Sequence, residues 1–144
     1  MSRYDPALDV ADALHSACIR ILRRVRAADD ETGLSAPKLS ALSVLVFAGP
    51  MSLTQLARAE QVTAPTMSKL VADLQGEGLA AKRADREDKR GVRIEVTAKG
   101  KALFDAGRRG RLNLLRAKLA KLPKPELEKL REAAALMLRV AAGD

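Results

Sequence analysis

The chain has 144 residues, of which 26 are lysine or arginine and 18 are acidic, so it carries a net charge of +8 at pH 7. This balance favours a polyanionic partner, meaning nucleic acid or, less often, an anionic membrane surface. The single cysteine excludes an intrachain disulfide, and the single histidine argues against most metal sites and the usual acid–base constellations of enzymes. With one tyrosine and two phenylalanines, a base-stacking RNA surface is also unexpected.

Apolar residues at helical spacing predict two helices in the first third of the chain. The first covers residues 7–28 and carries an apolar stripe that includes Cys18, which we expect to be a structural thiol and not a redox sensor. A polar loop is expected over residues 29–33. The second helix covers residues 36–48 and ends at Gly49-Pro50.

Two short helices and a β-hairpin are predicted in the middle of the chain. Residues 52–59 open on a capping-box pattern, Ser-Leu-Thr-Gln, and residues 63–75 begin with a threonine cap and end before two glycines. Residues 79–83 can form a short strand, and residues 92–96 alternate apolar with polar side chains. Because a polar run separates these strands, we expect them to pair as a hairpin.

Two longer helices are predicted to complete the chain. Thr97 caps a helix that runs to about residue 121, and the Pro123-Lys124-Pro125 break separates it from the last helix. Both helices carry stripes of leucine and other apolar residues. The fold is therefore expected to be mainly α with a small β-hairpin.

A helix pair followed by a hairpin is the composition of a winged helix-turn-helix, in which the second helix lies in the major groove of DNA. Small residues let such a helix approach the duplex closely, and hydroxyls and the helix N-terminus bind phosphates or base edges. On its own, a face of this kind is more typical of a solvated helix, but the hairpin that follows it favours DNA binding. Helical geometry places Pro65, Lys69 and Ala72 opposite the apolar face, with Thr66 and Ser68 flanking that side.

The segment between the two strands is strongly basic. Residues 82–93 hold six basic and three acidic residues, and a basic hairpin tip can place an arginine in the narrow minor groove, where the potential of DNA is most negative. Asp88 stands two residues before Arg90 and can hold its guanidinium through paired hydrogen bonds. Arg90 is therefore the strongest single candidate for a DNA contact.

These segments resemble a known family. Residues 83–100 contain an Asp-x-Arg in the wing, a hydrophobic strand and a Thr-x-x-Gly that opens a helix, which is similar to the wing signature of MarR-type transcriptional regulators. Residues 63–79 resemble the recognition helix of that family and the Gly-Leu that follows it, and the resemblance covers residues 36–100. It implies that Ala64, Pro65, Thr66, Ser68 and Lys69 face the major groove, that Asp88 and Arg90 make the wing contact, and that Arg86, Lys89 and Arg93 lie on phosphates.

The resemblance also implies a homodimer whose N- and C-terminal helices intertwine. Residues 35–97 would form the winged helix-turn-helix DNA-binding domain, and residues 1–34 and 98–144 the dimerisation region. The apolar stripes support pairing, because they exceed what a winged domain of roughly 65 residues can cover. Proteins of the MarR type bind short, roughly palindromic operators in double-stranded DNA, mostly as repressors, and many release DNA when a small-molecule effector enters a cleft beside the dimer helices.

The alternative is a basic adaptor on the same fold that binds RNA or an anionic membrane surface, since a basic amphipathic helix such as residues 99–121 can lie on anionic lipid. The hairpin tip favours DNA, because lipid binding needs no positioned arginine. The chain has no apolar run of membrane-spanning length and its first residues lack a signal-peptide core, so we expect a cytoplasmic protein that does not enter a membrane. No catalytic constellation, cofactor or metal site is expected, and therefore no enzymatic activity.

Overall fold

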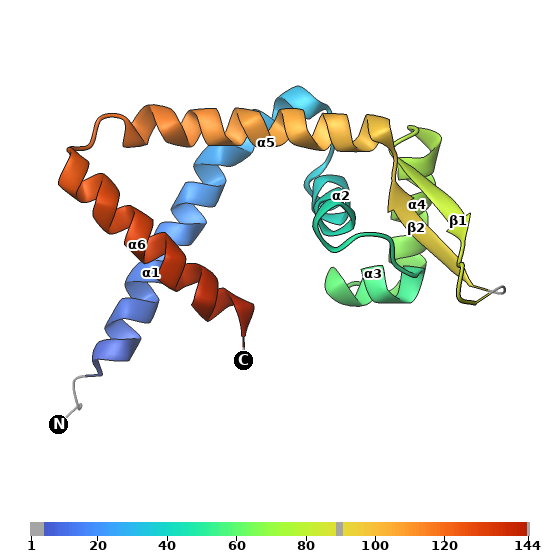
Figure 1. Ribbon diagram of the computed structural model, residues 1–144, viewed down its shortest axis with the longest axis horizontal. Helices are drawn as coiled ribbons and strands as arrows, with labels where there is room; N and C mark the ends of the chain where they lie inside the picture. The colour runs from blue at the N-terminus through green and yellow to red at the C-terminus, as the bar shows by residue number, and fades with distance from the viewer. Residues whose placement is uncertain (1–4, 89–90, 144) are drawn as a thin grey trace.

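The computed structural model describes residues 5–88 and 91–143 of a mainly helical fold (Figure 1). A long helix runs along one side of the molecule, with short helices and the hairpin at one end and the first and last helices toward the other. The arrangement confirms the predicted fold class. The elements are α1 (Pro6–Val25), the 3₁₀ helix η1 (Arg26–Thr32), α2 (Ala36–Ala48), α3 (Leu53–Ala59), α4 (Ala64–Gly76), β1 (Ala80–Ala84), β2 (Val92–Val96), α5 (Ala98–Leu119) and α6 (Lys124–Ala142).

The segment after α1 is helical where the sequence predicts a loop. The prediction for residues 29–33 is wrong up to Thr32, because these residues belong to η1. The Thr32 hydroxyl donates to the Asp29 carbonyl at 2.6 Å, and Gly33 ends the turn in the left-handed region at a φ of 70°. A Cβ on Gly107 of α5 would lie 2.9 Å from Thr32 Cγ2, so η1 packs closely on α5 at this glycine. No local sequence pattern predicts the contact between Thr32 and Gly107.

Local capping fixes the starts of α3 and α4 where the sequence predicts them. The Gln55 side chain accepts from the Ser52 N–H at 2.9 Å, and the Ser52 hydroxyl accepts from the Gln55 N–H at 3.1 Å, which completes the capping box. The Thr63 hydroxyl caps α4 by accepting from the Thr66 N–H at 3.3 Å. Gln61 adopts a left-handed φ of 57° in the short turn between the helices. These bonds define the helix-turn-helix.

The hydrophobic core lies among α2, α3, α4, the hairpin and the first turns of α5. It is mainly aliphatic, as the scarcity of aromatic residues requires. Phe104 of α5 is its one buried ring among the described residues, and it meets the exposed Phe47 edge to face at 5.6 Å between ring centroids. The largest fully buried side chains are Leu42, Leu45, Leu56, Met67, Val71, Leu74, Leu79 and Ile94.

The predicted hairpin is confirmed. β1 pairs antiparallel with β2, with Ala80 opposite Val96 and Ala84 opposite Val92. Met51, in the link between α2 and α3, exchanges two backbone hydrogen bonds with Ile94 of β2, at 3.1 and 2.8 Å. The hairpin is therefore joined by its second strand to the segment that precedes the helix-turn-helix.

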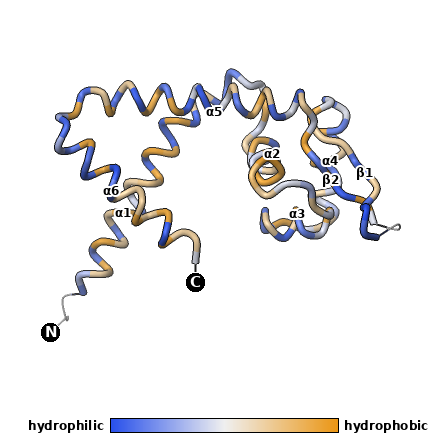
Figure 2. The backbone as a smooth tube through the Cα atoms, in the orientation of Figure 1, coloured by the Kyte–Doolittle hydropathy of each residue, from blue (hydrophilic) through white to orange (hydrophobic). Residues whose placement is uncertain are grey.

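α5 connects the hairpin to the terminal helices (Figure 1). It packs against α2, η1 and α1, and its Arg111 forms an ion pair with Asp29 of η1 at 2.6 Å. No described residue of α6 is buried, and hydrophobic positions recur along the exposed lengths of α1 and α6 (Figure 2). Cys18 of α1 is half-buried in the single chain. In residues 5–88 and 91–143, no helix has the length and apolar character needed to cross a bilayer.

Candidate nucleic-acid interface

α4 presents a small and hydroxyl-bearing face to solvent. Its rotation is fixed by Met67, Val71 and Leu74, which turn into the core and are at most 1% exposed. The Thr63 hydroxyl donates to the Thr66 hydroxyl at 2.9 Å and so orients the first turn. Backbone N–H groups and the positive end of the helix dipole favour phosphate at this end of the helix. The exposed residues of the first two turns include Ala64, Pro65, Thr66, Ser68 and Lys69.

The opposite end of α4 is clamped to α5 and α2. The Thr97 hydroxyl donates to the Gly78 carbonyl at 2.6 Å, and Lys99 Nζ donates to the Glu77 carbonyl at 3.0 Å. The Glu77 carboxylate pairs with Lys38 Nζ of α2 at 2.9 Å. These contacts hold the end of α4 against the start of α5. The sequence identifies Thr97 as a helix cap, which the structure confirms, but gives no signal for the long-range contacts.

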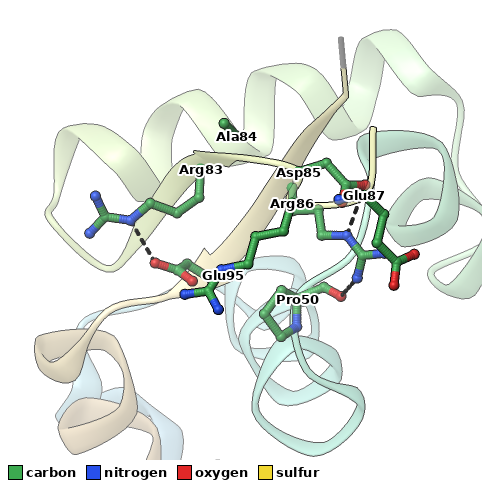
Figure 3. Close-up of a pocket in the computed structure, with 8 residues that line it drawn as sticks. Pro50, Arg83, Ala84, Asp85, Arg86, Glu87 and Glu95 are labelled. Atoms are coloured by element: carbon green, nitrogen blue, oxygen red, sulfur yellow. Dashed lines mark hydrogen bonds and ion pairs between the residues drawn. The ribbon is translucent and has the colours of Figure 1, made fainter. Parts of the chain in front are cut away.

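The outer side of the hairpin forms a hollow of about 620 Å³ lined by charged side chains (Figure 3). Arg83 of β1 pairs with Glu95 of β2 at 2.7 Å. Arg93 Nε donates to Asp85 Oδ2 at 3.1 Å, and Arg93 Nη1 donates to the carbonyl of Pro50, between α2 and α3, at 3.3 Å. Carboxylates of the hairpin itself therefore hold two of its arginines.

Asp85 lines this hollow and has a lowered pKa. The Glu87 N–H donates to Asp85 Oδ1 at 3.0 Å, and this bond, followed by the Arg93 guanidinium, lowers the pKa of the Asp85 carboxyl below its usual value of 3.8. Partial burial acts in the opposite direction. Because the folded pKa is lowered, the stabilisation is fully present above pH 3.8 and is lost as the pH falls through the folded value.

Residues 32–91, which include the whole helix-turn-helix, match the model of the MarR family. An HTH-type transcriptional regulator of Mycobacterium bovis is 35% identical over 129 residues, which cover 90% of each chain. The chain belongs to the MarR family of transcriptional regulators. This membership agrees with the prediction that the chain is not an enzyme.

Solved structures share the fold of this MarR-family chain. The transcriptional regulator Tm0710 of Thermotoga maritima has a TM-score of 0.81 and 21% identity over 95% of this chain and 99% of that one. A mutant of MepR from S. aureus, bound to an oligodeoxyribonucleotide, has a TM-score of 0.68 and 19% identity over 92% and 97% of the two chains. At these identities the likeness is one of fold.

The predicted contact residues of this MarR-family chain fall on α4 and on the hairpin, which pack beside each other. The five on α4 are all exposed. Arg86 and Asp88 are exposed on the hairpin, whereas Arg93 is half-buried in its ion pair with Asp85. Lys89 and Arg90 lie outside the described residues, so the wing contact assigned to Asp88 and Arg90 stays a prediction.

Proposed function

We propose that this chain represses transcription as a homodimer that binds a palindromic operator through α4 and the hairpin. The observation that carries the proposal is the exposed, small and hydroxyl-bearing face of α4 beside a basic hairpin. A protein of the same fold, MepR, has been solved with an oligodeoxyribonucleotide. In this proposal, residues 35–97 form the DNA-binding domain, and residues 1–34 and 98–144 form the dimerisation region.

The surface area of the single chain supports the dimer. A compact monomer of 15.5 kDa exposes about 7,200 Å², whereas this chain exposes 11051 Å². The excess is about 3,800 Å² per chain, or about 7,600 Å² for two chains, which is more than enough surface for the roughly 2,000–5,000 Å² that obligate dimers commonly bury in total. Much of the exposed apolar surface lies on α1 and α6, including Leu8, Val10, Leu22, Leu136, Leu138 and Val140.

Pairing about a two-fold axis explains how one short helix reads an operator. Two copies of α4 would enter successive major grooves about 34–36 Å apart, so each half-site would be read by one protomer. The test is selection of bound duplexes from a random pool, followed by footprinting. A recovered inverted repeat supports the proposal, and a pool that yields no enriched duplex contradicts it. Repression is tested by placing the recovered repeat across a promoter and measuring transcription with and without the protein.

A variant of α6 tests the dimer without disturbing the isolated fold. Leu130→Glu changes a side chain that is 46% exposed in the single chain and lies on the apolar stripe of α6. We expect this variant to sediment as a monomer at concentrations where the wild type is dimeric, because a buried, unpaired carboxylate costs several kcal/mol.

The matched control is Ala135→Glu, which adds the same charge on the opposite face of the same helix, where the residue is also exposed. This control should remain dimeric. A monomeric wild type, or a Leu130→Glu protein that remains dimeric at every concentration, would contradict the assignment of α6 to the interface.

Lys69 is expected to contact a phosphate from the exposed face of α4. The Lys69→Ala dimer loses two such contacts, so the slope of log affinity against log salt should become shallower by about 2, with an affinity loss of about tenfold. Lys121→Ala, two residues after the end of α5 and therefore a whole helix away from the hairpin, removes the same charge and should leave the slope unchanged. An unchanged slope for Lys69→Ala would show that this lysine does not touch the backbone.

A cavity where α1 and η1 meet α2 and α5 supports an effector site. It has a volume of about 220 Å³ and lies among α1, η1, α2 and α5, next to the Asp29–Arg111 ion pair. A small ligand bound in this cavity would contact both α5 and α2, and α2 packs against α3 and α4. We expect such a ligand to raise the melting temperature of the free protein and to weaken its DNA binding, because it would favour one arrangement of these helices.

A further inference from the structure

We propose that Arg93 is a positioning residue, which ties the hairpin to the link between α2 and α3 through Asp85 and Pro50, and does not itself bind phosphate. The inference rests on the proposed DNA-binding function and refines it. The family resemblance implies a phosphate contact for Arg93, so the two assignments compete for the same side chain.

The guanidinium of Arg93 is engaged by two different segments. Its Nε donates to Asp85 Oδ2 at 3.1 Å, within the hairpin, and its Nη1 donates to the Pro50 carbonyl at 3.3 Å, 43 residues earlier in the chain. The Asp85 side chain is only 18% exposed, so the ion pair is partly shielded from solvent. A planar guanidinium suits this role because its donors point in fixed directions and can bridge two acceptors.

Asp85 is itself fixed in place, which makes it an effective anchor. Its N–H donates to the Gly91 carbonyl at 2.9 Å, and its Oδ1 accepts from the Glu87 N–H at 3.0 Å. A Cβ on Gly91 would lie 3.1 Å from Asp85 Cβ, so the two sides of the hairpin approach closely here. The lowered pKa of the carboxyl agrees with an aspartate that is held as the anion.

We call the Asp85–Arg93–Pro50 contacts the tether. Its Pro50 end lies beside the backbone bridge that also joins β2 to the link between α2 and α3. Met51 and Ile94 exchange two backbone hydrogen bonds, and each is the chain neighbour of a tether residue, Pro50 or Arg93. The bond from Arg93 to Pro50 therefore extends the same attachment by one residue along β2, toward the loop of the hairpin. With the backbone bridge alone, β2 is held at one position. With the tether, the outer part of the hairpin is held as well, and with it the position of the wing relative to α4.

The two assignments predict opposite effects when the negative charge of Asp85 is removed. If Arg93 binds phosphate, Asp85 competes with DNA for the guanidinium and repels the backbone, so neutralising it should strengthen binding. If Arg93 positions the hairpin, neutralising Asp85 releases the tether and binding should weaken. The sign of the change separates a contact from a positioning role.

The decisive variant is Asp85→Asn, because asparagine keeps an oxygen that can accept from the Glu87 N–H but replaces the oxygen that accepts from Arg93 with an NH₂ group, which cannot accept. We expect its affinity for an operator duplex to fall roughly tenfold per dimer, as two charge-assisted hydrogen bonds are weakened. The matched control is Glu87→Gln, which removes the same charge from an exposed side chain two residues after Asp85. This control should bind DNA as tightly as the wild type or more tightly. Tighter binding by Asp85→Asn overturns the proposal.

Hydrogen exchange without DNA tests the tether independently of function. The amides of Met51 and Ile94 should exchange roughly tenfold faster in Asp85→Asn than in the wild type, and at the wild-type rate in Glu87→Gln. Unchanged exchange in Asp85→Asn overturns the proposal whether or not DNA binds. A wild type that binds no duplex would contradict the proposed function, while the exchange rates still decide whether the tether exists.

Discussion

Replacement of Gly100 by alanine is expected to destabilise the protein by about 3 kcal/mol, the upper end of the usual cost of overpacking. A Cβ at this position would lie 2.1 Å from the Leu79 carbonyl oxygen, 3.0 Å from its carbon and 2.9 Å from Val96 Cγ2. Two of these three atoms are backbone, so no rotation of a side chain relieves the clash. To relieve the clash, either the first turn of α5 or the segment around Leu79 that leads into β1 must move.

Either movement breaks contacts that hold α4. Thr97 caps α5 by accepting from the Gly100 N–H at 3.0 Å, and its own N–H donates to the Leu79 carbonyl at 3.0 Å. The same hydroxyl donates to the Gly78 carbonyl at the end of α4. Gly100→Ala is therefore expected to weaken DNA binding as well as stability, since α4, which we propose binds DNA, is no longer held against α5.

Urea unfolding followed by circular dichroism measures this effect. The control is Gly76→Ala, at the last residue of α4, where a Cβ would meet nothing within 4 Å. That substitution should be neutral or stabilising by up to about 1 kcal/mol, because alanine favours the helix. A Gly100→Ala protein as stable as the wild type would show that the approach of α5 to Leu79 is looser than described.

Arg90→Ala is expected to abolish specific operator binding while leaving the fold intact. The sequence predicts that this arginine enters the minor groove, and a dimer carries two copies. A single specific arginine contact is worth about 1–3 kcal/mol, so the loss should be roughly 30-fold to 10⁴-fold per dimer. Electrophoretic mobility shift with the selected operator, at physiological salt, measures it.

Stability and a charge-matched variant keep this result interpretable. The midpoint of unfolding of Arg90→Ala should equal that of the wild type. Arg131→Ala, which removes an arginine of α6 whose side chain is 79% exposed, should retain most of the affinity. If Arg90→Ala still binds the operator specifically, the wing assignment is wrong, and the basic residues of the hairpin serve only as a general attraction for DNA.

Local sequence signals predicted the helix-turn-helix well because they act over a few residues. The Ser52–Gln55 capping box and the Thr63 and Thr97 caps each depend on a side chain and an N–H three residues apart, and all three form as predicted. The alternation over residues 92–96 predicted β2 for a similar reason, since one face of the strand carries the buried Ile94.

Contacts between distant segments could not be predicted in the same way. Asp29 and Arg111 are 82 residues apart, and Pro50 and Arg93 are 43 residues apart. Their pairing depends on how α5 and the hairpin pack on earlier elements, and no periodicity records it. The 3₁₀ helix η1 was missed for this reason, because it packs against a glycine of α5 and its residues alone are typical of a polar loop.

Hydroxyl-radical footprinting of the selected operator, combined with the mass of the complex in solution, tests the central claim most directly. We expect two protomers per duplex and two symmetric protected patches, whose centres are about one helical turn, or 10–10.5 base pairs, apart. One protomer bound to a single protected patch, or a duplex with no protection at saturating protein, would contradict it.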